Sequence, residues 1–137
     1  MKRKMAIALI GTLSLTLTGC HLGDPRAKHY RASVTTISDN VCVMIQPEKD
    51  ENIVSLIISE IGRPENKLEK FDAISVSSDK CVPDFGYKYE MGHAYNFSVI
   101  LESPEKKGKG IIPASRIFGV DFSLWKNNGK LEASPLN

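Results

Sequence analysis

From residue 30 onward, apolar and polar residues alternate with a period of two, which predicts β-strands that bury one face. The clearest alternations run over 95–102 and 118–124, and an Asn-Asn-Gly turn at 127–129 is typical of a hairpin. Shorter or less regular strands are predicted over 30–37, 41–46, 53–61, 71–77 and 130–133. The chain beyond its first 28 residues is therefore expected to be mostly sheet.

Helical periodicity is weak throughout this region. The rival reading is at 53–61, where Ile53, Leu56 and Ile57 also fit one face of a helix, but the β-branched residues there favour a strand. The pattern predicts one all-β domain over 29–137, an immunoglobulin-like β-sandwich of about seven strands without the antibody core disulfide. Tyr95 opens its strand just after a glycine turn, the place of the tyrosine corner in such sandwiches.

The first 19 residues have the layout of a secretory signal. Residues 1–4 form a positively charged segment, and 5–17 carry no charge and are too few to span a bilayer, which takes about 20 residues. Leu17, Thr18, Gly19 and Cys20 follow. They resemble the lipobox of bacterial lipoproteins, which implies cleavage before Cys20 and covalent lipid on its thiol. A cleaved signal followed by a chance cysteine is the alternative.

The residue after the lipidated cysteine bears on location. An Asp there tends to retain enterobacterial lipoproteins at the inner membrane, and His21 stands there instead. The resemblance thus implies a protein held at the periplasmic face of the outer membrane. Residues 20–28 lack apolar periodicity and are predicted to be a tether, about 25–30 Å long if fully extended.

Charge argues against nucleic-acid binding. The chain has 18 Lys and Arg against 16 Asp and Glu, and three of the cations (Lys2, Arg3 and Lys4) leave with the signal. Taking 3 from 18 leaves 15 cations against 16 anions, a net charge of −1. A balanced surface of this kind lacks the positive footprint that binding to phosphates requires.

Two cysteines remain for the folded part, Cys42 and Cys81. In the oxidising periplasm a disulfide between them is the expected state. It would close a loop of about 40 residues and contribute about 4 kcal/mol. Two buried free thiols or a shared metal are the alternatives, although two cysteines without a nearby histidine make a poor zinc site.

Reactive groups are sparse. Of the three histidines, only His93 is placed where it could belong to a site. The chain has no G-x-S-x-G elbow, no H-E-x-x-H motif and no glycine-rich phosphate loop. We therefore expect no catalytic residues, no metal site and no cofactor beyond the lipid on Cys20; the protein is not predicted to be an enzyme.

A protein partner is the more natural expectation. Phe85, Tyr87 and Tyr89 crowd one loop after Cys81 and are candidate interface anchors; alternatively, Phe85 and Tyr87 close the end of the sandwich. Trp125 falls on the outward phase of its strand, where it either marks an interface or lies over a sheet edge. The lysine-rich 104–110 segment is predicted to be a hairpin-like loop that is solvated or touches lipid phosphates or an acidic partner.

Four stretches carry a family resemblance: VCVMIQPE at 41–48, CVPDFGY at 81–87, AYNFSV at 94–99 and SPLN at 134–137. They resemble the small enterobacterial lipoproteins described as type VI secretion immunity periplasmic lipoproteins. The resemblance implies a protein that binds and neutralises a toxin delivered by neighbouring cells. A structural or assembly lipoprotein that binds a resident envelope component is the alternative, and a small-ligand or glycan binder is a third class.

Overall fold

The computed structural model describes residues 26–136. The predicted signal segment, Cys20 and His21 lie outside the described residues. The described chain forms eight strands and one short helix: β1 Lys28–Arg31, β2 Ser33–Ile37, β3 Asn40–Met44, β4 Asn52–Glu60, β5 Arg63–Lys70, β6 Ala94–Glu102, α1 Pro104–Gly108, β7 Ser115–Asn127 and β8 Lys130–Pro135. Strand β1 begins at the last residue of the predicted tether.

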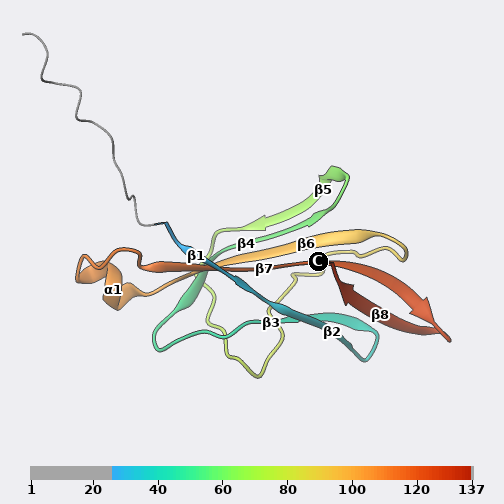
Figure 1. Cartoon of the computed structure of the whole chain (residues 1–137), viewed down its shortest axis with the longest axis horizontal. Coiled ribbons are helices and arrows are strands. Elements are labelled where there is room, and N and C mark those ends of the chain that lie inside the picture. Colours follow the sequence, from blue (N-terminus) through green and yellow to red (C-terminus); the bar gives the residue numbers. More distant parts are fainter. Residues whose placement is uncertain (1–25, 137) are drawn as a thin grey trace, which may run out of the picture.

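Six of the strands form one sheet in the order β1-β7-β6-β4-β5, with β8 also paired to β7. Strand β1 runs parallel to the first part of β7, and β8 runs antiparallel to its last part, so two short strands share one edge of β7. Strands β2 and β3 form a second sheet, which lies below the first in Figure 1 and contacts β8. The predicted all-β sandwich is confirmed.

The core follows from the alternation seen in the sequence. Successive side chains of a strand point to opposite faces, so every second residue is buried along β6 and along 118–124 of β7. Cross-strand neighbours from these two strands meet in the core as Tyr95 with Phe122 and Phe97 with Val120. The buried apolar side chains of the central strands are Ile53, Leu56, Ile58, Tyr95, Phe97, Val99, Leu101, Phe118, Val120, Phe122 and Leu124.

Tyr95 also forms the expected corner. Its hydroxyl accepts a hydrogen bond from the backbone N–H of Glu90 at 2.6 Å, which ties the start of β6 to the loop before it. The same back-bonding to residues a few positions upstream defines the tyrosine corner of immunoglobulin-like sandwiches.

The sheet edge differs from the sequence prediction. Strand β5 was not predicted, because Arg63–Lys70 is mostly charged and begins with Arg-Pro, and it pairs with β4 through its backbone. Charge and proline are common on edge strands, where they prevent pairing with other chains. The predicted strand at 71–77 was wrong; it makes a single bridge, between Ile74 and Ile53.

Two further segments differ from the sequence prediction. The predicted strand over 30–37 is divided at the buried Ala32, where the chain leaves β7 and turns into β2. The predicted hairpin-like loop at 104–110 begins instead with helix α1. Ser103 caps its first turn and Pro104 stands at the start, a combination that favours helix initiation. Over residues 26–136, no helix is long and apolar enough to cross a membrane.

Candidate functional site

The loop between β5 and β6 is fastened to the second sheet. Cys81 is disulfide-bonded to Cys42 in β3, as the sequence predicted. The next residue, Val82, is buried and its N–H donates to the carbonyl of Val43 at 2.7 Å. In Figure 1 this connection, coloured yellow-green, passes beside β3. The disulfide and this backbone hydrogen bond therefore hold in place the part of the loop that comes directly before its aromatic residues.

A tight turn at residues 84–87 follows, which we call the Phe85 turn. The N–H of Tyr87 donates to the carbonyl of Asp84 at 3.0 Å, and the Asp84 carboxylate accepts from the N–H of Gly86 at 3.1 Å. Phe85 and Gly86 have φ angles of 53° and 74°. Glycine adopts this left-handed conformation readily, but an aromatic residue rarely does. The turn thus holds Phe85 in a strained backbone conformation.

Tyr87 and Tyr89, at the end of the turn and just after it, are partly buried and pack against the core. Their rings meet edge to face at 4.9 Å, and each also packs edge to face on Tyr95, at 5.8 and 5.0 Å. The Tyr87 hydroxyl donates to the carbonyl of Asn66 in β5 at 2.9 Å. Burial raises the pKa of Tyr87 to about 12 and also raises that of Tyr89. Both tyrosines close the end of the core, and neither is a freely exposed anchor.

Phe85 itself points outward. Its residue surface is 47% exposed, and the Lys70 ammonium lies 5.3 Å from the ring centroid. Phe71, the next residue after Lys70, is 68% exposed. A groove of about 410 Å³ is lined by Ser75, Val76, Ser77, Lys80, Cys81 and Pro83. Its last lining residue directly precedes the turn in the sequence. The Phe85 turn and this groove form the surface we regard as the candidate site.

Trp125 belongs to a different surface. It is 37% exposed and its indole N–H donates to the carboxylate of Glu132, its cross-strand neighbour in β8, at 3.1 Å. Phe122, on which Tyr89 packs, points to the opposite face of β7. The structure therefore does not bring Trp125 together with Tyr89, and the indole lies against the edge strand.

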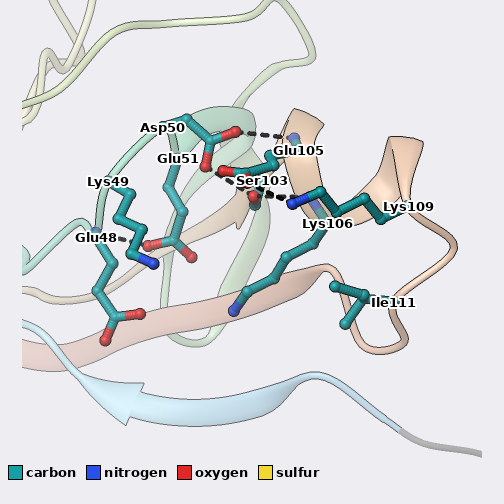
Figure 2. Close-up of a pocket in the computed structure, with 9 residues that line it drawn as sticks. All are labelled: Glu48, Lys49, Asp50, Glu51, Ser103, Glu105, Lys106, Lys109 and Ile111. Atoms are coloured by element: carbon teal, nitrogen blue, oxygen red, sulfur yellow. Dashed lines mark hydrogen bonds and ion pairs between the residues drawn. The ribbon is translucent and has the colours of Figure 1, made fainter.

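A cluster of charged residues closes the end of the sandwich near α1 (Figure 2). Asp50 accepts hydrogen bonds from the Ser103 hydroxyl at 2.7 Å and from the N–H of Glu105 at 2.8 Å, and these bonds lower its pKa. The depression beside them has a volume of about 260 Å³, below the usual range for ligand pockets. Because these polar groups bond to one another, the cluster fastens the helix to the loop before β4.

Arg116 anchors the same end from β7. Its guanidinium donates to both carboxylate oxygens of Glu51, at 2.9 and 2.5 Å, and lies about 5 Å from the ring centroids of Tyr30 and Phe118. Burial is the largest single influence and tends to raise the pKa of Glu51, but the hydrogen bonds from Arg116 and from the Glu48 N–H, together with the nearby positive charges, outweigh it and the pKa is lowered. Sequence reasoning missed this pair, since 65 residues separate its members.

His93, singled out from the sequence, contacts Glu60 through Nδ1. The Asn66 amide donates to the other Glu60 oxygen at 2.7 Å, and these two hydrogen bonds lower the pKa of the buried carboxyl. Glu90 lies 3.4 Å from the second imidazole nitrogen. Across the described part of the chain, no group of three or more His, Cys, Asp or Glu is arranged to hold a metal ion.

Comparison with known protein families gives a match that covers most of the chain. A family model described as Domain of unknown function (DUF7480) matches residues 29–127. The chain belongs to this family. The DUF7480 match runs from β1 to the end of β7, so it includes both cysteines and the Phe85 turn. No curated protein and no solved structure matches the chain.

Proposed function

We propose that this protein is a lipid-anchored immunity protein, which binds a toxin delivered by neighbouring cells and neutralises it at the periplasmic face of the outer membrane. The lipobox-like sequence ending at Cys20 and the family resemblance support the location and the role. The Phe85 turn is the observation that carries the binding function, because an exposed aromatic in a left-handed turn costs stability and has no role in the core.

The surroundings of Phe85 suit a preformed binding site. The disulfide, the Val82 hydrogen bond and the packed tyrosines beneath the turn all restrict its motion. A rigid anchor loses less conformational entropy when it docks, so more of the contact energy contributes to affinity. Aromatic side chains are also enriched among the residues that dominate interface energy.

Neutralisation in this proposal needs binding alone. The domain would cover the toxin's active site or the surface by which it reaches its target, with Phe85 entering a pocket and the adjoining groove receiving a toxin segment. Lys70, beside the Phe85 ring, would favour an acidic rim around that pocket.

The test is a co-culture of a strain lacking the protein with its parent, whose type VI secretion system is either working or disabled. Immunity predicts that the mutant dies only beside the working system. The native chain should rescue it, Phe85→Asn should rescue poorly, and Trp125→Phe, on the other surface, should rescue fully. Each variant's abundance in the envelope is measured by immunoblot.

Equal survival beside working and disabled systems would contradict the immunity role. Cross-linking through the Phe85 turn to a resident envelope protein would then favour the assembly role. Full rescue by Phe85→Asn would leave the immunity role intact but would show that the Phe85 turn is not the binding site.

A further inference from the structure

The second surface of interest is the connection between β6 and β7. It consists of helix α1 and a tip formed by Ile111 and Ile112, which are 46% and 70% exposed. Ile112 has the highest exposure among the large apolar residues of the described chain. Lys106, Lys107 and Lys109 precede the tip, and the exposed ammonium groups of Lys107 and Lys109 lie 3.2 and 2.8 Å from the carboxylates of Glu102 and Glu105. Adjacent apolar residues flanked by cations are typical of segments that enter a lipid interface.

The topology places this tip beside the point where the chain enters the fold. Strand β1 runs parallel to β7, with Lys28 opposite Arg116, and the connection ends where β7 begins. Figure 1 shows α1 and the start of β1 at the same end of the sheet. The segment leading back to Cys20 therefore joins the domain at the end that carries Ile111 and Ile112.

The connection is built to hold its shape. The N–H of Ser103 donates to the carbonyl of Ala114 at 2.9 Å, and the N–H of Ile111 donates to the carbonyl of Lys106 at 2.9 Å. Asp50 bonds α1 to the body of the domain at its first turn. These hydrogen bonds hold the connection in one conformation, so the two isoleucines have a fixed position at the end of the sheet.

We propose that this tip is a membrane-docking surface: Ile111 and Ile112 enter the interface of a phospholipid bilayer, while Lys107 and Lys109 exchange their exposed pairs with Glu102 and Glu105 for its phosphate groups. This inference rests on the proposed lipid anchor, which keeps the domain within about 25–30 Å of the bilayer. The contact would orient the domain. The turn at 127–129 lies at the other end of β7, about 35–40 Å away along the strand, and would point into the periplasm.

The test uses the lipidated protein in liposomes of phosphatidylethanolamine and phosphatidylglycerol that contain brominated acyl chains, which quench tryptophan on contact. The native chain has one tryptophan, Trp125. In a Trp125→Phe background, Ile112→Trp places a reporter at the tip. Ile61→Trp is the matched control, because Ile61 is 48% exposed and follows the far end of β4.

We expect Ile112→Trp to be quenched several-fold more than Ile61→Trp or native Trp125. Equal quenching of the two reporters would overturn the docking surface. Blue-shifted but unquenched emission from Ile112→Trp would also overturn it, since protein rather than lipid would then cover the tip. Failure of the protein to float with the liposomes would contradict the lipid anchor itself, so the two failures are distinguishable.

Discussion

At the scale of single residues, Phe85 is the position where stability and function are expected to conflict. Its left-handed conformation is unfavourable for an aromatic side chain and acceptable for asparagine. Phe85 is 47% exposed and does not belong to the buried core, so little core energy opposes the change. Residues kept in such conformations commonly serve binding or catalysis.

Phe85→Asn should therefore leave the free energy of unfolding within about 0.5 kcal/mol of native, since relieved backbone strain offsets the lost contact with Lys70. Phe85→Val should cost about 1 kcal/mol or more, because β-branched residues tolerate this conformation poorly. Urea denaturation of both variants measures the difference. Equal losses in the two would show that the side-chain contacts of Phe85, and not its backbone, decide stability.

A second residue-scale expectation concerns Glu51. Its side chain is 3% exposed and paired with Arg116, so Glu51→Gln should cost about 3 kcal/mol by leaving the guanidinium with a weaker partner. The pKa of Glu51 lies below its ordinary value of 4.5 in the folded state. The stabilisation is thus complete above that value and is lost as pH falls through the lower, folded pKa.

Thermal unfolding from about pH 7 to about pH 3 checks this expectation. The difference in stability between native protein and Glu51→Gln should shrink at the acid end of the range. Glu65→Gln serves as the control, because Glu65 is 72% exposed and only loosely paired with Arg63. A constant difference across the whole range would show that Glu51 and Arg116 are not coupled as described.

At the scale of elements, helix α1 depends on its cap. The Ser103 hydroxyl accepts from the N–H of Lys106 at 3.2 Å and donates to Asp50, so one buried hydroxyl links helix, loop and sheet end. Five residues are too few to form a stable helix alone. The helix therefore persists because its first turn is bonded to neighbouring structure.

Ser103→Ala should destabilise the domain by about 1–2 kcal/mol, as for other lost caps. Ser77→Ala, which removes a similar hydroxyl-to-Asp79 bond in an exposed turn, should cost less than about 0.5 kcal/mol. Chemical denaturation measures both. Because Ser103 and Asp50 share a bond, their combined alanine substitutions should cost less than the sum of the separate ones.

At the scale of the whole molecule, the disulfide joins the small sheet to the loop that connects β5 and β6 of the large sheet. Cys42 lies in β3 of the small sheet, and Cys81 lies within the loop that leaves β5, carries Phe85 and returns to β6 of the large sheet. Its 39-residue separation makes it a constraint on much of the unfolded chain. It should therefore influence both global stability and the rigidity of the candidate site.

Replacing both cysteines with alanine should lower the free energy of unfolding by about 4 kcal/mol. Hydrogen exchange should show the greatest loss of protection in the loop between β5 and β6, and little loss in β6 and β7. The Ser103→Ala protein provides a comparison destabilised at helix α1. Uniform loss of protection throughout the sheet would show that the bond acts on global stability alone.

Much of the fold was predictable because its signals are local. Alternation within β6 and β7 reports which face is buried, and the Asn-Gly pair reports the turn between β7 and β8. The two cysteines of the folded part allow a single pairing. The outward phase of Trp125 could likewise be read from the alternation of its own strand.

The rest depended on contacts between distant segments. Strand β5 lacks the apolar face by which a strand is usually predicted. It forms because its backbone N–H and C=O groups pair with those of β4 beside it. The parallel pairing of β1 with β7, which brings the chain entry beside Ile111 and Ile112, has no signature in either segment.

The sequence by itself determined the alternating strands, the hairpin and the cysteine pair, since these follow from the spacing of neighbouring residues and from composition. Only the tertiary structure decided that the Phe85 side chain is exposed while those of Tyr87 and Tyr89 are partly buried against the core. It also decided that Arg116 meets Glu51. Exposure and ion pairing depend on which segments, distant in the sequence, pack against a side chain. That packing is a property of the assembled sandwich, not of any one strand.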